Sequence, residues 1–426
     1  MKFKCSKLIY PAYEVDAKDR KPLGRPFGFI ADFEKSQVSF RCKNLMRAVK
    51  LQNQHIIDFD SVEKCHRTEP ESSRRVVRFT RDGTTICLGD ALRMYKRWLP
   101  PTVIISDGPY GLGSYEGDPS TPDNLAEYYL PHLVEWSNYA RSNTTLWFWN
   151  SELGWANMHR LIQENGWEFR NCHIWNKGIG HIAGNANTKT LRKFPVITEV
   201  CVQYVRKVSF SVAGDSLTIK EWLRHEWQRT GLPLCKTNEA CGVANAASRK
   251  YFTQCHLWYF PPPEAFEMLQ KYANNHGNPA GKPYFALDGK KPLSKGQWEN
   301  MRSKFYCKAG ITNVWPEPAV RGGERLKNKN KCLHMNQKPL KLLEMIIEAS
   351  SDKNDVIWEP FGGLCSAAIA AHKLRRRAFA AEINRDYFDI STQRLDNYDI
   401  FRTNKRDSFK GLGTLQTLRK NKRSYS

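Results

Sequence analysis

Short apolar runs alternate with amphipathic segments along much of this chain, and this alternation predicts a layered α/β fold. The run Val103-Ile104-Ile105 is apolar at every position, as expected of a parallel strand that is covered on both faces. Further strands are predicted at 85–88, 145–149, 172–175, 200–204, 355–358 and 377–381. Helices are predicted at 91–98, 154–165, 340–349 and 366–374. We therefore expect a mostly parallel central sheet with helices packed against it.

The alternation stops near residue 207 and resumes after Lys338-Pro339. The intervening sequence predicts helices at 221–229 and 264–273. It also predicts two short helices within 238–252, hinged at Gly242. Aromatic and basic residues are interleaved throughout this stretch. We expect it to form a smaller, α-rich recognition insert rather than more of the sheet.

The composition adds a strong positive charge to this picture. The 426 residues include 66 Lys and Arg against 43 Asp and Glu, a formal net charge of +23. Such an excess predicts binding to a polyanion, above all to a phosphate backbone. An anionic membrane is a weaker alternative, because no long basic amphipathic helix is visible.

Other sequence features exclude several classes of protein. No apolar run reaches the length of a membrane span and the amino terminus has no signal core, so we expect a cytoplasmic protein without a membrane partner. The 12 cysteines form no CxxC pair. We therefore predict neither a disulfide framework nor a metal site.

The segment after the apolar strand is a candidate for chemistry on an amino group. The carboxylate of Asp107 and the carbonyl of Gly108 can both accept hydrogen bonds from one NH2 group, and Pro109 completes a tight turn. Tyr110, expected to be exposed, can lie against a flat ring, as aromatic side chains do with extruded bases. The segment thus predicts a site for a nucleobase. An ordinary strand-to-turn junction is the alternative, since Asp, Gly and Pro are common turn residues.

A second turn, Glu359 to Gly363, follows a predicted strand and opens the helix at 366–374. Glycine lets a ligand approach the backbone closely, and the amino end of a helix favours negative charge. Glu382 ends the next strand, where an acid can bind a ribose, as in nucleotide-binding α/β folds. Helix capping is the alternative for the turn, and an ordinary surface acid is the alternative for Glu382.

Together these segments resemble the amino-methylating DNA methyltransferases that use S-adenosylmethionine. Asp107-Gly108-Pro109-Tyr110 stands where that family carries its (D/N/S)-P-P-Y catalytic motif. Glu359 to Gly363 resembles the cofactor loop D-P-F-x-G-x-G. Shorter similarities to the family's T-Q-K-P segment, its G-D-x-L element and a further strand end occur at His334 to Pro339, Leu88-Gly89-Asp90 and Trp175-Asn176-Lys177.

The resemblance covers about residues 85–395 and departs from the family pattern at two positions. Gly108 replaces the usual first proline, so we expect a looser backbone there. Cys365 replaces the last glycine of the cofactor loop, where positive φ is not freely adopted by a residue with a side chain. The order of the motifs is that of the β group of the family.

This resemblance implies a Rossmann-like methyltransferase fold that is circularly permuted and carries the smaller α-rich insert. It also implies a division of the chain into functional parts. These are an N-terminal extension (1–84), a catalytic half (85–206), a DNA target-recognition region (207–330), an S-adenosylmethionine-binding half (331–397) and a basic tail (398–426).

The resemblance further implies roles for single residues. The catalytic residues would be Asp107, Gly108, Pro109 and Tyr110. The cofactor-binding residues would be Asp90, Asp107, Lys338, Glu359, Phe361, Gly363 and Glu382. Asp90 is expected near the adenine ring of the cofactor and Lys338 near its carboxylate. A helix cap and a surface cation are the respective alternatives.

Three basic residues are candidates for contacting DNA. A short helix within 238–252 could place Arg249 and Lys250 in the major groove, in the manner of a helix-turn-helix. A packed helical hairpin is the alternative. Arg321 is the third candidate.

The expected activity is methyl transfer to the 6-amino group of adenine in duplex DNA after base flipping, because Asp at the first motif position is associated with adenine in this family. A cognate restriction endonuclease on a separate chain is the partner that the family suggests. Three alternatives stay open at this point. They are methylation of the 4-amino group of cytosine, a non-catalytic DNA-binding protein on the same scaffold, and an RNA methyltransferase.

Overall fold

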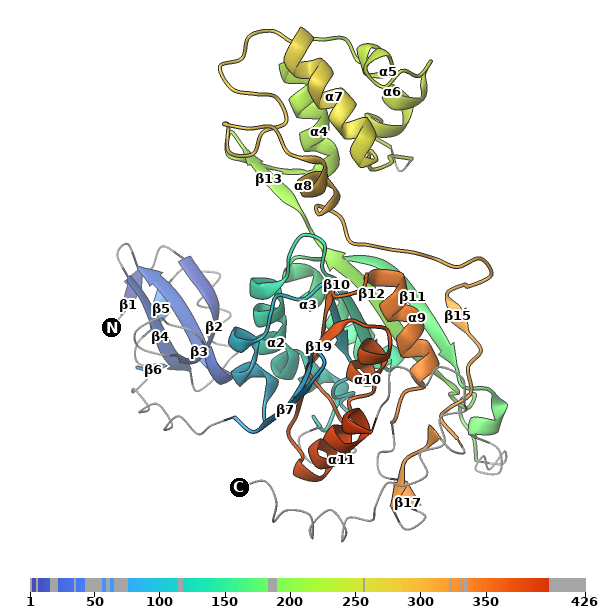
Figure 1. Cartoon of the computed structure of the whole chain (residues 1–426). Coiled ribbons are helices and arrows are strands. Elements are labelled where there is room, and N and C mark those ends of the chain that lie inside the picture. Colours follow the sequence, from blue (N-terminus) through green and yellow to red (C-terminus); the bar gives the residue numbers. More distant parts are fainter. Residues whose placement is uncertain are drawn as a thin grey trace. The chain divides into compact units, whose positions relative to one another are not determined.

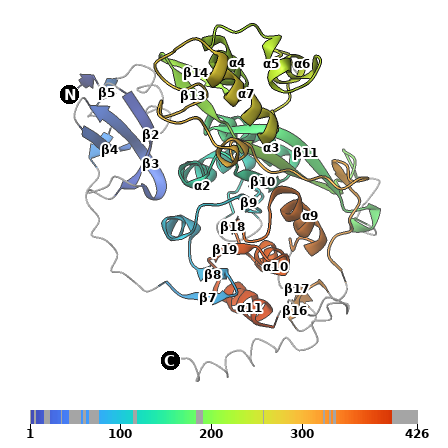
Figure 2. The same ribbon diagram turned by 45° about the horizontal axis from the view of Figure 1, so that its top comes forward.

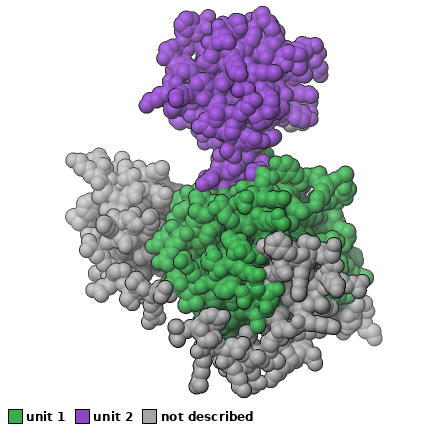
Figure 3. Space-filling view, in the orientation of Figure 1, with its two compact units in different colours: residues 1–140, 145–204, 305–426 green, residues 141–144, 205–304 purple. Residues whose placement is uncertain are grey.

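The computed structural model describes residues 76–113, 118–182, 190–255, 257–321, 324–328, 331–332 and 336–397, together with the backbone of six strands before residue 65. Residues 398–426, predicted as a basic tail, and His334 of the predicted T-Q-K-P-like segment lie outside the described residues. The chain forms two compact units (Figure 3). Unit 1 comprises 1–140, 145–204 and 305–426, and unit 2 comprises 141–144 and 205–304.

A nine-stranded sheet forms the centre of unit 1, in the order β15-β11-β12-β10-β9-β18-β19-β8-β7 (Figure 1). The neighbours from β10 to β8 are parallel, whereas β7 pairs antiparallel with β8 at the edge. The predicted α/β class with a mostly parallel sheet is thus confirmed. The strands are β7 (Arg78–Arg81), β8 (Thr84–Leu88), β9 (Val103–Ser106), β10 (Thr145–Asn150), β11 (Trp167–Asn176), β12 (Thr198–Arg206), β15 (Val314–Trp315), β18 (Val356–Glu359) and β19 (Arg377–Glu382).

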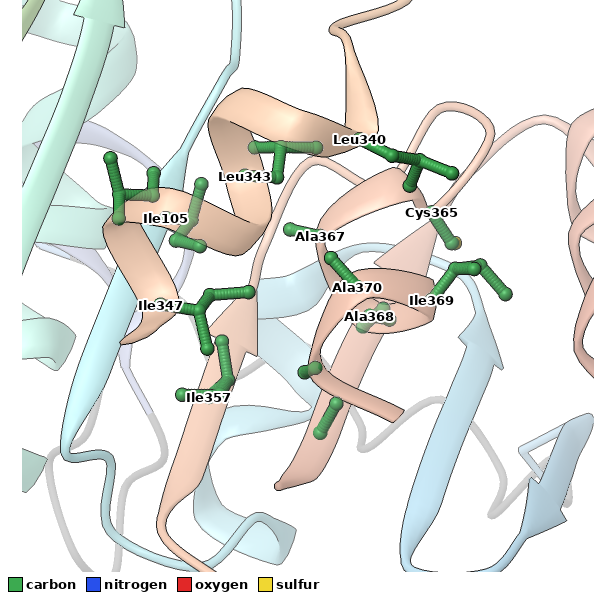
Figure 4. Packing of buried hydrophobic residues seen from close by; sticks show 14 of the residues in the cluster. Ile105, Leu340, Leu343, Ile347, Ile357, Cys365, Ala367, Ala368, Ile369 and Ala370 are labelled. Atoms are coloured by element: carbon green, nitrogen blue, oxygen red, sulfur yellow. The ribbon is translucent and has the colours of Figure 1, made fainter. Parts of the chain in front are cut away.

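Helices cover both faces of this sheet, and Figure 2 shows α2 and α9 on opposite sides of the central strands. Ile105 and Ile357 face α9 (Leu340–Ser350) and α10 (Ser366–Lys373), where leucine, isoleucine and alanine side chains interlock (Figure 4). Ile104 faces the opposite cluster, which holds residues of α2 (Leu125–Tyr139) and α3 (Glu152–Glu164). Successive side chains of a strand point to opposite faces, so an entirely apolar strand is buried on both.

The prediction of one α-helix at 91–98 is wrong. Two 3₁₀ turns, η1 (Ala91–Arg93) and η2 (Tyr95–Arg97), replace it. The segment is short, and nucleating an α-helix over so few residues is costly. In 3₁₀ turns, residues three apart lie on one side, so the turns still bury Ala91 and Met94 together.

Unit 2 has a hydrophobic core of its own, rich in aromatic rings. Phe266 and Trp298 stack with their ring centroids 4.1 Å apart. The two short helices predicted within 238–252 are present, and Gly242 between them has φ +64°. The elements are β13 (Ser209–Val212), β14 (Asp215–Thr218), α4 (Ile219–Arg229), α5 (Lys236–Ala240), α6 (Ala246–Tyr251), α7 (Pro263–His276) and α8 (Lys295–Glu299).

The remaining elements are short or lie outside the central sheet. Strands β2, β3, β4 and β6 form a separate antiparallel sheet. Helix α11 (Arg385–Asp396) adds Phe388 and Leu395 to the core on the α9 face. The bounds of the others are β1 (Lys2–Lys4), β2 (Lys7–Val15), β3 (Pro22–Phe33), β4 (Ser36–Cys42), β5 (Ile56–Asp58), β6 (Val62–Lys64), β16 (Lys327–Asn328), β17 (Lys331–Cys332), η3 (Pro122–Asn124) and η4 (Ile179–His181).

Candidate active site

Four acidic residues lie at the carboxyl ends of four adjacent parallel strands. Asp107 follows β9, Glu359 ends β18, Glu382 ends β19 and Asp90 follows β8 after one glycine. Because parallel strands end at the same edge of a sheet, two segments that are far apart in the sequence meet here. In open α/β sheets this edge is where ligands bind.

The predicted catalytic turn and the predicted cofactor turn are in direct contact. A Cβ atom on Gly108 would lie 2.6 Å from Cδ2 of Phe361 and 2.6 Å from the hydroxyl of Tyr129. No side chain fits in that space, so glycine at 108 allows the Phe361 ring to pack against the turn. Gly108 therefore makes the turn closely packed instead of loose.

The catalytic turn is also held by hydrogen bonds from one helix, α2, and from the end of one strand, β10. The hydroxyl of Tyr129 and the side-chain amide of Asn150 both donate to the carbonyl of Pro109, at 3.0 and 3.1 Å. By contrast, no residue that the structure describes donates a hydrogen bond to the carbonyl of Gly108. The turn thus presents one free backbone acceptor next to Asp107.

Asp107 belongs to a chain of alternating charges. Its Oδ1 accepts a hydrogen bond from Nζ of Lys338 at 2.7 Å, and the same ammonium lies 3.3 Å from Oε2 of Glu199. The other oxygen of Glu199 pairs with Lys177 at 2.6 Å. The Lys338 side chain is only 2% exposed, so its charge depends on these two carboxylates.

The pKa shifts in this network follow from its charges. Burial alone would lower the pKa of Lys338, but Asp107 and Glu199 outweigh it and raise the pKa above the ordinary value. Burial would raise the pKa of Glu199, but Lys338 and Lys177 hold it below the ordinary value. The network therefore keeps Lys338 and Glu199 charged at neutral pH.

Tyr110 is buried, which corrects the expectation of an exposed ring. Its hydroxyl oxygen lies 3.0 Å from Glu199 and 3.2 Å from Asp107, so its one hydrogen is shared between these two acceptors. The ammonium of Lys338 lies over its ring. Burial and the neighbouring Glu199 raise the pKa of Tyr110 well above its usual range. The phenol thus stays protonated and joins the two carboxylates.

The acids on the cofactor side bind backbone groups instead. Glu359 accepts hydrogen bonds from the amides of Ala367 and Ala368 at the start of α10, which is the capping arrangement noted above as the alternative. Glu382 accepts from the amides of Gly363 and Asn384, at 2.5 and 2.7 Å. Burial raises the pKa of Glu359 to about 8 and that of Glu382 to about 7.

Two further cofactor-side residues can be placed. Asp90 is half-buried and caps η1 by accepting a hydrogen bond from the amide of Leu92 at 2.9 Å. Cys365 is fully buried and adopts the left-handed conformation with φ +50° and ψ +43°. The chain therefore does take positive φ at this position, at a steric cost that glycine would not have.

The same edge has buried polar atoms that are unpaired. Within the described part of the chain, neither Oγ of Ser106 nor Nε1 of Trp149 has a hydrogen-bond partner. Ser106 precedes Asp107, and Lys338 lies 5.4 Å from the Trp149 ring. Unpaired buried polar groups are rare, so these two atoms are suited to a polar ligand.

The candidate DNA-binding residues lie in different units. Arg249 and Lys250 are exposed on α6 of unit 2, whereas Arg321 is exposed in unit 1. A guanidinium nitrogen of Arg321 lies 3.0 Å from the position of a Cβ on Gly180. Their contacts with DNA, and the boundaries 207–330, stay predictions.

The sequence did not reveal the partners of the catalytic turn. Glu199, Tyr129 and Asn150 were not candidates, and Lys177 appeared only as part of a strand-end element. A local signal exists for Glu199, since it is an acid at the start of an apolar strand. Its pairing with Tyr110 joins distant segments and has no local signal.

Neither metal ligation nor a membrane span is indicated by the described residues. No cluster of three or more His, Cys, Asp or Glu side chains there could hold a metal ion. Among the same residues, no helix combines the length and the hydropathy that crossing a bilayer requires.

The mostly parallel sheet with acids at its carboxyl edge is typical of α/β proteins that bind nucleotide-like ligands. A comparison with family sequence profiles identifies the family. The sequence profile of the DNA methylase family N6_N4_Mtase matches residues 102–393, well over half of the chain. The chain belongs to this family of DNA methylases that act on amino groups.

Three curated relatives are each named a type II methyltransferase. The chain is 29% identical to M.ScaI of Streptomyces caespitosus over 160 residues, 36% of this chain and 47% of that protein. It is 33% identical to M1.MboII of Moraxella bovis over 122 residues, 28% of this chain and 47% of that protein. It is 34% identical to M.HpaI of Haemophilus parainfluenzae over 89 residues, which are 21% of this chain and 27% of that protein. The matched part is thus less than half the length of each relative.

Solved structures give looser matches. A PvuII DNA methyltransferase (cytosine-N4-specific) aligns over 75% of this chain and 89% of its own, with 10% identity and a TM-score of 0.43. An M1.HpyAVI–SAM complex aligns over 73% of this chain and 98% of its own, with 15% identity and a TM-score of 0.39. Membership of the family therefore depends on the sequence match.

Proposed function

We propose that this chain is a site-specific DNA methyltransferase that moves a methyl group from S-adenosylmethionine to the 6-amino group of adenine in duplex DNA. The contact between Gly108 and Phe361 is the observation that carries this proposal, because it joins an amine-binding turn to a ligand-binding turn. Membership of a DNA methylase family and the net charge of +23 support a DNA substrate.

S-adenosylmethionine, when bound, supplies a methyl group on a positively charged sulfur. Phe361 and Gly363 would border it, and Glu382 would bind the ribose. Each oxygen of Glu382 accepts one backbone amide, so the carboxylate has lone pairs left for hydroxyl groups. Asp90 lies further along the same edge, where the adenine ring of the cofactor is expected.

Lys338 was expected at the carboxylate of the cofactor, but its ion pairs favour another role. Its ammonium is already held by Asp107 and Glu199. We propose that it positions Asp107 through the hydrogen bond to Oδ1. Glu359 would act indirectly as well, by fixing the start of α10 behind the cofactor turn.

The free acceptors of the catalytic turn suit an exocyclic amine. The amine of a base is a poor nucleophile because its lone pair is delocalised into the ring. Oδ1 of Asp107 is taken by Lys338 and Tyr110, which leaves Oδ2 beside the carbonyl of Gly108. Two acceptors aimed at the two N–H bonds favour a tetrahedral nitrogen, so positioning and electrostatics would drive direct transfer. Tyr110 would border the flipped base while fixing Asp107.

The finer parts of the proposal come from the order of the motifs and from the relatives. Catalytic turn, insert and cofactor turn follow one another as in the circularly permuted β group. We propose that residues 207–330 read the DNA sequence, with Arg249, Lys250 and Arg321 as contacts. The relatives are named type II methyltransferases, which supports a role in restriction-modification beside a separate endonuclease.

Transfer of labelled methyl groups tests this function. The purified chain should methylate duplex DNA, and Asp107→Ala should lower the rate by about 100-fold or more, since one transition-state hydrogen bond is lost. Glu164→Gln, an exposed change on α3, should leave the rate unaltered. Glu164→Gln should unfold at the temperature of the unchanged protein. Asp107→Ala removes one of the two carboxylates that pair with the buried Lys338, so it should unfold at a lower temperature, and its rate is measured where it is still folded.

The same assay identifies the substrate. Digestion to nucleosides and mass spectrometry should yield methyladenine, and methylcytosine alone would move the proposal to the 4-amino group of cytosine. Preference for RNA in direct competition would overturn the DNA substrate. A folded chain that transfers no methyl group to genomic DNA would favour the binding-only alternative. Single-molecule sequencing of methylated DNA would then locate the recognised site.

A further inference from the structure

The connection between β11 and β12 exposes an aromatic side chain to an unusual degree. Phe194 is 93% exposed, the largest value among the large apolar residues that the structure describes. Val196 and Ile179, at 51% and 72%, are exposed in the same connection. Single exposed apolar residues are ordinary, but a group of them is typical of a surface that binds a partner.

This connection leads directly into the catalytic network. The amide of Lys177 donates to the carbonyl of Ile197 at 2.9 Å, which joins the end of β11 to the residue before β12. Two residues later, Glu199 accepts the hydrogen bond from Tyr110. Glu199 is five positions after Phe194, and a fully extended chain spans at most about 3.6 Å per residue. The two Cα atoms are therefore at most roughly 18 Å apart.

The charges beside Phe194 indicate the kind of partner. Arg192 and Lys193 precede it and are exposed. An aromatic ring next to cations is complementary to nucleic acid, because bases stack on rings while phosphates attract cations.

We propose that Phe194 enters the base stack of the duplex at the place that the flipped target base leaves. This inference rests on the proposed methyltransferase function. Removing a base from the stack is unfavourable, and DNA-binding proteins offset such costs by inserting apolar side chains between base steps. Phe194 would act as a wedge that stabilises the open duplex, while Arg192 and Lys193 bind the flanking phosphates.

A comparison of two substrates tests the wedge. One duplex carries the target base in a normal pair at the site found by sequencing, and the other carries it opposite an abasic position, where flipping is easier. Phe194→Ala should slow methyl transfer to the paired duplex by about 5- to 150-fold, the range for one stacked ring. It should slow transfer to the abasic-opposed duplex much less. Phe194→Trp should keep both rates.

The controls separate this inference from the function on which it rests. Phe305→Ala removes a half-exposed phenylalanine ring elsewhere in the sequence of unit 1 and should change neither rate. Equal slowing of both duplexes by Phe194→Ala, or no slowing, would overturn the wedge while leaving the methyltransferase function intact. An unchanged protein that is inactive on both duplexes would contradict the function itself and the wedge with it.

Discussion

The two sides of the carboxyl edge use buried acids in different ways. On the proposed catalytic side, Asp107 and Glu199 both pair with the ammonium of Lys338, and Glu199 also pairs with Lys177. On the cofactor side, Glu359 and Glu382 accept backbone amides, and burial raises the pKa of each, to about 8 and about 7. Side-chain cations keep an acid ionised, whereas neutral amides do not fully offset its burial. The proposed catalytic side therefore contains paired charges, whereas the acids of the proposed cofactor side are partly protonated at neutral pH.

Removing the shared cation should have the largest effect on stability. Lys338→Met leaves the buried carboxylate of Glu199 and the half-buried carboxylate of Asp107 without their common partner, so the free energy of unfolding should fall by about 3–5 kcal/mol. Urea unfolding at neutral pH measures this loss. Adding Glu199→Gln removes one of the two carboxylates that lost Lys338 and should recover part of the lost free energy of unfolding.

A neighbouring lysine provides the control for this change. Lys341 pairs with Glu317 at 2.6 Å, but its side chain is 79% exposed. Lys341→Met should therefore cost no more than about 1 kcal/mol. Equal losses for the two lysine variants would show that burial of the Lys338 ion pairs does not distinguish the catalytic side.

The raised pKa values of the cofactor side predict a dependence of stability on pH. A carboxyl with a raised folded-state pKa stabilises the protein while protonated, and this contribution is lost as the pH rises through that pKa. Between pH 6.5 and 8.5, Glu359 and Glu382 should together lower the free energy of unfolding by on the order of 2–3 kcal/mol.

Buried histidines act in the opposite direction, but only weakly in this window. Burial lowers the pKa of His132 to about 3 and that of His173 to about 4, so both are neutral in the folded protein above pH 6.5. Loss of the remaining protons from the unfolded chain then opposes the fall by about 0.4 kcal/mol for each histidine. Urea unfolding across the window should show a clear fall that Glu359→Gln reduces by more than half. The exposed control Glu164→Gln should keep the full fall. An equally steep fall in Glu359→Gln would contradict the assignment.

The contact that joins the two sides should be sensitive to a single methyl group. Gly108→Ala places a Cβ against Phe361 and Tyr129, so the turn must move, at a cost of about 1–3 kcal/mol. The methyl-transfer rate should fall along with the stability. Gly296→Ala is the matched control, since nothing lies within 4 Å of its Cβ position on α8. A stable and fully active Gly108→Ala variant would show that the two turns need not touch.

The sheet could be predicted from the sequence, because strands buried on both faces are uniformly apolar. Helix α2 could not be predicted in this way, since Pro131 interrupts the helical pattern from inside. The catalytic and cofactor turns were found because their residues are contiguous. The burial of Tyr110 could not be predicted, because it depends on Glu199 and Lys338, which are close to Tyr110 only in the folded chain.

The smallest expected effect concerns the backbone of Cys365, which opens α10 behind the cofactor turn. A residue with a Cβ in the left-handed region costs about 1–2 kcal/mol, and glycine does not have this cost. Cys365→Gly and Cys365→Ala both remove the buried sulfur, so their difference isolates the backbone. We expect the glycine variant to unfold at a higher urea concentration than the alanine variant, by about 1 kcal/mol in the free energy of unfolding. The reverse order would mean that the turn relaxes out of the left-handed region when the thiol is lost. The shape of the cofactor side would then depend on packing of the sulfur and not on the conformation of the chain.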